Sequence, residues 1–263
     1  MPELPDVEGF RRYIERTSLH QAIKEIDVRD DYILKGISPD ELIRALTGRR
    51  FESTRRHGKY LFLRLDNGRH LYVHFGMTGQ PAYFKDMADD PCFDRLLIAF
   101  TNSHHLAYDD QRKLGRIGLT DDPYAFLREK RIGPDALSLD YEGFVQAFKG
   151  HRGAIKPALL NQGIIAGIGN IYADEILFQA RIHPLTPIER LNEKTLERLF
   201  RCMREVLETG IEHTVEGRSF PDSYLIPHRG RGEDCPCGGK VESIKISQRT
   251  AYFCPACQSL PYL

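Results

Sequence analysis

The side chains best suited to chemistry are four cysteines near the C-terminal end of the chain. They form a Cys-x-Cys pair, Cys235 and Cys237, and a later Cys-x2-Cys pair, Cys254 and Cys257. Four thiolates in two close pairs match the tetrahedral coordination of structural zinc. In a chain without a secretion signal, such a cluster favours a metal over disulfides. The sequence therefore predicts one structural zinc ion, and it disfavours His228 as a substitute ligand.

The residues between the two cysteine pairs predict a β-hairpin. Residues 240–253 read KVESIKISQRTAYF, and a metal-bound hairpin of this kind is a zinc ribbon, in which the ion replaces a core too small to fold alone. Arg249 is expected at or near the hairpin tip, where a guanidinium can bind a phosphate through two parallel hydrogen bonds. The alternative is a solvent-exposed arginine. Because the Cys-x-Cys pair is unusually tight, we expect a strained or weaker metal site.

The charge balance does not by itself indicate nucleic acid. The chain has 37 basic and 37 acidic side chains, so any positive surface for DNA must be local. Residues 49–59 and 228–231 are basic, although a charged run alone is more often a solvated surface. A ribosomal or RNA-binding protein is disfavoured, because such proteins depend on a broad basic field.

The N-terminal half is expected to be mainly β after one helix. Val7, Phe10 and Ile14 give residues 6–17 an apolar helical face. Asp66-Asn67-Gly68 predicts a hairpin turn, because Asn-Gly tolerates positive φ. Strands are expected over 59–65, 70–76, 81–84, 95–101 and 105–108.

Helical periodicity dominates after Gly133-Pro134-Asp135. Helices are expected over 141–149, 155–161, 170–181 and 193–212. Asn192 is the expected N-cap of the last helix, and Cys202 flanks its apolar stripe as a core residue. Because there is neither a signal peptide nor an apolar run of about 20 residues, the expected location is the cytoplasm, with association with the nucleoid when bound to DNA.

Several motifs occur in a diagnostic order along the chain. They are Pro2-Glu3-Leu4-Pro5, Gly58-Lys59-Tyr60-Leu61, the block GIGNIYADE at 167–175, and the zinc ribbon. Together they resemble the formamidopyrimidine-DNA glycosylase/endonuclease VIII family over essentially the whole chain. The resemblance implies an α+β multi-domain fold: an N-terminal β-sandwich with flanking helices, a helical helix-two-turns-helix domain and a C-terminal zinc ribbon. The predicted limits are 1–131 for the catalytic sandwich, 132–150 for a linker, 151–224 for the helical domain and 225–263 for the ribbon.

The resemblance also implies catalytic roles. Once Met1 is removed, Pro2 carries a secondary amine that can attack C1′, and a free α-amine has a pKa of about 8, so much of it is neutral. Glu3 is the implied general acid–base partner. Lys59 is implied in proton transfer, and Arg249 in phosphate binding and δ-elimination. The ordinary alternatives are a rigid terminal proline, an exposed acid and surface cations.

Further residues are implied to bind DNA. Flipping a base out of the helix costs a few kcal/mol, and Met77, Arg112 and Leu114 are implied to fill the gap. Core packing is the alternative for Met77 and Leu114. Lys156 and Asn170 match phosphate contacts, and the start of the helix at residue 170 is expected to offer backbone N–H groups to phosphate.

Two departures from the family pattern affect the predicted substrate: Leu114 stands where the guanine-repair branch usually has Phe, and the segment 217–229 is short. A third departure, Asp6 in place of Glu, shortens the reach of that carboxylate and bears on a supporting role only. Leu114 and the short segment weaken a preference for 8-oxoguanine, whereas Arg112 favours one. We therefore predict excision of oxidised bases generally, with purines such as 8-oxoguanine or formamidopyrimidine slightly favoured.

The sequence thus predicts a bifunctional DNA glycosylase and abasic-site lyase of base excision repair, acting through a Schiff base on Pro2 and β,δ-elimination. The expected partner is damaged double-stranded DNA, bound by a monomer with one structural Zn²⁺, no small-molecule cofactor and no membrane association. An oxidised-pyrimidine glycosylase of the endonuclease VIII type is one alternative. A non-catalytic DNA-binding module is the other, although such a module has no need of Pro2, Glu3 and Lys59 together.

Overall fold

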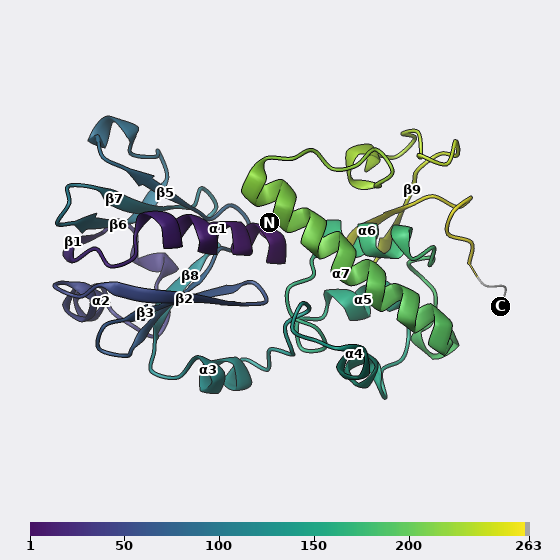
Figure 1. The fold of residues 1–263 in the computed structure, drawn as a ribbon, viewed down its shortest axis with the longest axis horizontal. Helices are drawn as coiled ribbons and strands as arrows, with labels where there is room; N and C mark the ends of the chain where they lie inside the picture. Colours follow the sequence, from purple (N-terminus) through teal and green to yellow (C-terminus); the bar gives the residue numbers. More distant parts are fainter. Residues whose placement is uncertain (261–263) are drawn as a thin grey trace. The chain divides into compact units, whose positions relative to one another are not determined.

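The computed structural model describes residues 1–260, and the chain divides into two compact units (Figure 1). The N-terminal unit contains Met1–Pro2 and Asp6–Lys130. The C-terminal unit contains Glu3–Pro5 and the chain from Arg131 onwards. Within the described residues, no helix is both long and apolar enough to cross a membrane.

The N-terminal unit is built on two four-stranded antiparallel sheets, ordered β1-β6-β7-β5 and β2-β3-β4-β8. The first contains β1 (Ile23–Val28), β5 (Gln80–Phe84), β6 (Asp94–Phe100) and β7 (His105–Asp109). The second contains β2 (Phe51–His57), β3 (Tyr60–Leu65), β4 (His70–His74) and β8 (Arg116–Thr120). The expected β-sandwich is confirmed.

Helix α1 (Leu4–Thr17) contributes an apolar face to the sandwich core. Val7 and Ile14 are buried there, and the Phe10 ring lies 4.6 Å from that of Phe75. The expected face is therefore correct, although α1 begins at Leu4 rather than at residue 6. The shorter helices of this unit are α2 (Pro39–Leu46), α3 (Pro123–Glu129), η1 (Asp31–Ile33) and η2 (Met87–Asp89).

All five predicted strands occur, with ends shifted by up to two residues. The predicted hairpin turn closes with the Gly68 N–H donating to the Leu65 carbonyl, and Gly68 has φ of +89°. Strands β1, β2 and β8 were not predicted. Each lies at the edge of its sheet, and β2 (FESTRRH) carries charged side chains that an edge strand leaves in solvent.

The C-terminal unit contains the four predicted helices: α4 (Tyr141–Phe148), α5 (Ile155–Leu160), α6 (Asn170–Gln179) and α7 (Glu193–Glu216). Asn192 caps α7 as expected by accepting from the Thr195 N–H. Helix α7 runs four residues further than predicted and ends at left-handed Gly217. Short turns η3 (Ile188–Arg190) and η4 (Ile226–His228) follow α6 and α7 respectively.

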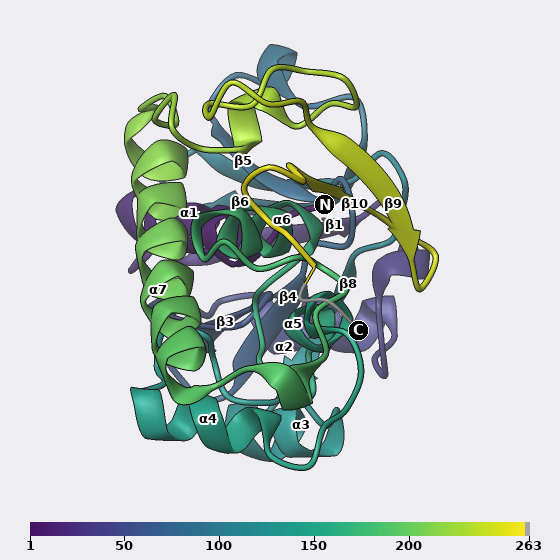
Figure 2. The ribbon, with the colours of Figure 1, turned by 90° about the vertical axis from the view of Figure 1, so that its right-hand side faces the viewer.

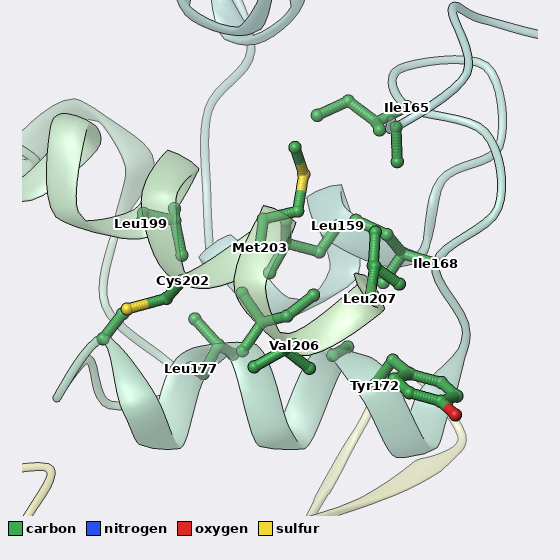
Figure 3. Close-up of a cluster of buried hydrophobic side chains, with 14 of the residues drawn as sticks. Leu159, Ile165, Ile168, Tyr172, Leu177, Leu199, Cys202, Met203, Val206 and Leu207 are labelled. Atoms are coloured by element: carbon green, nitrogen blue, oxygen red, sulfur yellow. The ribbon is translucent and has the colours of Figure 1, made fainter. Parts of the chain in front are cut away.

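The core of this unit lies between α6 and α7 (Figure 3). Tyr172 and Leu177 of α6 face Cys202, Val206 and Leu207 of α7, and all five are buried. The expected place of Cys202 in the core is confirmed. Gly210 permits this close approach, because a Cβ there would lie 2.5 Å from the Tyr172 ring.

The predicted hairpin consists of β9 (Glu242–Ile246) and β10 (Arg249–Phe253), drawn in yellow in Figure 2. Ser247 and Gln248 form its turn with left-handed φ values of 46° and 66°. Arg249 is the first residue after this turn, which confirms its predicted place beside the tip.

Candidate functional site

The four late cysteines form a compact site that suits zinc. Their Sγ atoms all lie within 4.8 Å of one another, with 3.3 Å between Cys235 and Cys237 and 3.8 Å between Cys235 and Cys257. Zn–S bonds of about 2.3 Å in a tetrahedron place the sulfurs about 3.8 Å apart. The His228 ring instead contacts the Asp222 carbonyl at 3.3 Å. The four thiolates therefore support one structural zinc ion.

A buried charge network fixes the strand that carries Arg249. Lys156 Nζ lies 2.5 Å from Asp174 Oδ1, and both side chains are almost fully buried. Asp174 Oδ2 accepts two hydrogen bonds from Arg229, at 2.8 and 3.1 Å. The Arg229 guanidinium lies 4.5 Å from the Tyr252 ring centroid. One carboxylate on α6 thus holds two cations that both contact β10.

The two predicted phosphate contacts also hold the hairpin. Lys156 Nζ and Asn170 Nδ2 both donate to the Thr250 carbonyl, at 3.1 and 3.0 Å. This carbonyl belongs to the residue directly after Arg249. For Lys156, which is 1% exposed, a direct phosphate contact would require the buried ion pair with Asp174 to open. The phosphate roles of Lys156 and Asn170 remain predictions.

Glu3 lies in a cradle formed by the start of α6. Its two carboxylate oxygens accept from the Ile171 N–H at 2.9 Å and the Tyr172 N–H at 3.3 Å. A Cβ on Gly169 would lie 2.2 Å from the Glu3 carboxyl carbon, so only glycine admits Glu3 here. The helix dipole favours a carboxylate at this position.

This cradle corrects one expectation from the sequence. The N–H groups at the start of α6 were expected to face phosphate, but those of Ile171 and Tyr172 donate to Glu3. The chain supplies its own anion, because the Leu4 N–H donates to the Gly167 carbonyl at 3.0 Å and so places Glu3 next to the helix start. Pro2 directly precedes Glu3, and its nitrogen becomes an amine only when Met1 is removed.

Lys59 lies in the tight turn between β2 and β3, not within the strand predicted from residue 59. It is 7% exposed. Arg56 supports this turn by donating to the Gly58 carbonyl at 3.2 Å, while its Nε lies 3.3 Å from Glu8. Burial, followed by the charge of Lys59, lowers the pKa of nearby His74 to about 4. His74 is therefore neutral near pH 7 and adds no second cation beside Lys59.

The three predicted gap-filling residues lie on two loops of the N-terminal unit. Met77 follows β4 and is 39% exposed; Leu114 precedes β8 and is 38% exposed. Arg112, between β7 and β8, is also exposed. Met77 and Leu114 are therefore not core residues, and the core-packing alternative for them is wrong.

Several buried charged residues were missed by the sequence analysis. Glu175 on α6 is fully buried, and its oxygens accept from the Leu225 and Ile226 N–H groups at 3.1 and 2.7 Å. Burial raises the pKa of Glu175 to about 7. Glu175 thereby anchors the end of the 217–229 segment. The signal was a pair of acids, Asp174-Glu175, inside an otherwise apolar helix.

The basic run at 49–59 is largely paired within its own unit. Arg49 and Arg50 approach Asp66 at 3.8 and 3.7 Å, and Arg56 approaches Glu8 at 3.3 Å. With the 3.5 Å contact between Arg50 and Glu52, three carboxylates pair with arginines of this run. It behaves as a paired surface rather than as an unopposed positive patch.

Three segments of the chain match known protein families. Residues 1–117 match the formamidopyrimidine-DNA glycosylase N-terminal domain, residues 132–222 its H2TH domain, and residues 232–260 a zinc finger found in FPG and IleRS. The formamidopyrimidine-DNA glycosylase of Herpetosiphon aurantiacus is 36% identical, with 98% of this chain and 100% of the relative covered. That of Geobacter metallireducens is 37% identical with the same coverage.

Solved structures agree with this assignment. Lactococcus lactis Fpg in a complex with abasic-site DNA has a TM-score of 0.87 and 31% identity, over 98% of this chain and 99% of that one. The same enzyme in a complex with FAPY-dG DNA has a TM-score of 0.88 and 30% identity, over 98% and 100%. The fold and the four-thiolate site thus define a DNA-repair glycosylase. The chain belongs to the formamidopyrimidine-DNA glycosylase family.

Proposed function

We propose that this enzyme removes oxidised bases from double-stranded DNA and then cleaves the strand at the abasic site. The observation that carries the proposal is the cradle around Glu3. This carboxylate is adjacent in the chain to Pro2, and the Ile171 and Tyr172 N–H groups hold its two oxygens. A fixed carboxylate next to an N-terminal secondary amine is the pair that imine-forming base excision requires.

In the proposed reaction, the Pro2 nitrogen attacks C1′, the C1′–N bond to the damaged base breaks, and the departing base takes up the proton that the Pro2 nitrogen loses. Glu3 protonates the sugar O4′ as the ring opens, which leaves an iminium between Pro2 and C1′. Removal of a C2′ proton then expels the 3′ phosphate by β-elimination, and a second elimination expels the 5′ phosphate. Lys59 takes part in these proton transfers, and Arg249 binds the phosphates of the damaged strand.

The proposed DNA contacts divide between readout and backbone. Met77, Arg112 and Leu114 fill the gap that the flipped nucleotide leaves, and Arg112 hydrogen-bonds to the unpaired base. Arg249 grips phosphate, and Lys156 and Asn170 support this backbone contact. The Lactococcus lactis relative has been solved with abasic-site DNA and with FAPY-dG DNA. We propose damaged duplex DNA as the partner of this chain, bound by a monomer.

We propose oxidised purines as slightly favoured substrates. The relatives named above are formamidopyrimidine-DNA glycosylases, which supports purine lesions. Arg112 fits this preference, whereas Leu114 and the short segment 217–229 favour a broader range. The alternative is an enzyme that prefers oxidised pyrimidines, and only a ranking of lesions distinguishes the two.

Borohydride trapping tests the proposed chemistry. Protein whose N-terminus is confirmed as Pro2 is mixed with duplexes that contain an abasic site, 8-oxoguanine, a formamidopyrimidine or an oxidised pyrimidine. We expect a covalent adduct on the abasic duplex. Among the duplexes with a damaged base, we expect the fastest adduct formation on a purine lesion. Pro2→Gly should slow trapping, and a chain that retains Met1 should give no adduct. Trapping that is unaffected by a retained Met1 would exclude Pro2, and no adduct with any duplex would favour a non-catalytic DNA-binding module.

A further inference from the structure

We propose that Asp110 and Thr78 are positioning residues that hold the two gap-filling loops of the N-terminal unit in one arrangement. The inference rests on the proposed function, since it takes Met77, Arg112 and Leu114 as the side chains that enter the DNA. It adds the reason why side chains from two separate loops act together.

The Asp110 carboxylate bonds to both loops. Its Oδ1 accepts from the Thr78 hydroxyl at 2.6 Å, and its Oδ2 accepts from the Gly115 N–H at 2.8 Å. Thr78 directly follows Met77, and Gly115 directly follows Leu114. One fully buried carboxylate therefore holds the neighbours of two gap-filling residues.

Thr78 extends the same chain of hydrogen bonds to the third residue. Its Oγ1 donates to Asp110 and also accepts from the Arg112 N–H at 3.0 Å. The order of donors is thus Arg112 N–H to Thr78 hydroxyl to Asp110 carboxylate. A hydroxyl can serve in both directions at once, whereas a methyl group serves in neither.

The backbones of the two loops also touch. A Cβ on Gly76, which has φ of +63°, would lie 2.4 Å from the carbonyl carbon of Leu114. A Cβ on Gly115 would lie 1.6 Å from the Tyr108 hydroxyl oxygen. Because neither glycine has a side chain, the first loop packs directly against the backbone of the second, and the second packs against Tyr108 of β7.

Asp110 is itself fixed by residues at the start of β6. Its N–H donates to the Phe93 carbonyl at 3.0 Å, and its carbonyl accepts from Arg95 Nε at 3.0 Å. The second loop has an additional restraint, because Lys113 Nζ lies 2.6 Å from Asp30 Oδ2. The backbone of the two loops that carry the gap-filling side chains is therefore held in one arrangement before DNA binds.

Thr78→Val and Thr78→Ser form a matched pair that tests this inference. Valine keeps the shape of threonine and removes the hydroxyl, while serine keeps the hydroxyl. We expect Thr78→Val to slow excision of an oxidised base about tenfold, as for the loss of a hydrogen bond to a charged group, and Thr78→Ser to stay within about twofold of the parent. Fluorescence of 2-aminopurine opposite the lesion should rise less with Thr78→Val, because the gap is filled less often.

A double-mutant comparison separates the inference from the function on which it rests. In a Met77→Ala/Leu114→Ala background, Thr78→Val should add little, because the side chains it positions are already absent. If the Met77→Ala/Leu114→Ala variant excises the oxidised base and raises 2-aminopurine fluorescence as the parent does, the gap-filling role fails. Suppose instead that the Met77→Ala/Leu114→Ala background is slow. The positioning role then fails if Thr78→Val has no effect in the parent, or if Thr78→Val slows the parent and this background equally.

A fold control completes the design. Thermal unfolding of Thr78→Val and Thr78→Ser is compared, and Thr78→Ala replaces Thr78→Val if the valine variant does not fold. Borohydride trapping on a preformed abasic duplex should fall less than base excision does for Thr78→Val, because no intact base has to be extruded. An equal loss of trapping and of base excision would overturn the inference in favour of a general structural defect.

Discussion

Asp94 shares one arginine with two other carboxylates where β6 begins. Arg29 lies 3.0 Å from Asp27, 2.6 Å from Asp90 and 3.1 Å from Asp94. The Asp94 side chain is fully buried, whereas Asp27 and Asp90 retain solvent contact. Burial, only partly offset by Arg29, raises the pKa of Asp94 to about 7. The least solvated of the three carboxyls therefore takes up the proton.

This raised pKa predicts a stability that falls as pH rises. Between the unfolded pKa of 3.8 and the folded value of about 7, the folded protein binds more protons at Asp94 than the unfolded chain. The stability that Asp94 contributes is fully present below its unfolded pKa and is lost as the pH rises through its folded pKa. Asp94→Asn mimics the neutral form and does not titrate. Between pH 5 and pH 7, the parent should therefore lose roughly 2 kcal/mol more of its free energy of unfolding than Asp94→Asn loses.

Denaturant titrations at both pH values measure the difference. Asp27→Asn, at a more exposed carboxyl of the same cluster, is the control and should leave the pH dependence close to that of the parent. Parallel pH profiles for Asp94→Asn and the parent would show that Asp94 is ionised throughout and would contradict the prediction.

Among the secondary-structure elements, interior ones were easier to predict than edges. The strands β3, β4, β6 and β7 alternate or run apolar because a buried core demands it. Strand β2 at a sheet edge has no such requirement, and its pattern FESTRRH resembles a charged loop. The long helix α7 was predicted from its apolar stripe, but its last turn was not. The helix continues past the end of the stripe and stops only at Gly217.

The candidate site shows the same limit for a different reason. The four cysteines were identified from their spacing, whereas Pro2 and Glu3 were identified from the resemblance of the N-terminal motif to the family. Asp110 and Asp174 were missed, because acidic residues in a sequence are most often solvated. Their roles depend on partners from distant segments, such as Thr78 for Asp110. The predicted domain limits at 131, 150 and 224 stay predictions.

The anchoring of β10 on α6 predicts a large effect for Asp174. Asp174→Asn leaves Lys156 buried without its counter-charge, and removal of one member of a buried pair costs about 3–5 kcal/mol. The double variant Lys156→Met/Asp174→Leu removes both charges and should be less destabilised than Asp174→Asn alone. Denaturant unfolding measures both, with zinc content as a check on the ribbon. Equal stability of Asp174→Asn and the parent would mean that Lys156 is uncharged or solvated.

At the scale of the whole molecule, the net charge of zero means that DNA binding must rely on a few placed cations. Much of the basic side-chain content is already paired, as in the run at 49–59. Arg249 differs, because it is exposed beside the hairpin tip and has no ion pair within residues 1–260. Its charge is available to a phosphate, and the zinc site and the Thr250 contacts hold its strand in place.

Arg249→Ala should therefore change how DNA affinity depends on salt. Each phosphate neutralised by the protein contributes about 0.9 to the slope of log K against log salt, through counterion release. We expect Arg249→Ala to reduce the slope by about 1 and to weaken binding of a duplex with a stable abasic-site analogue. Arg201→Ala is the control, because Arg201 is exposed on α7 and lies 3.9 Å from Glu205. An unchanged slope for Arg249→Ala would show that a neutral protein of this family grips the backbone through other residues.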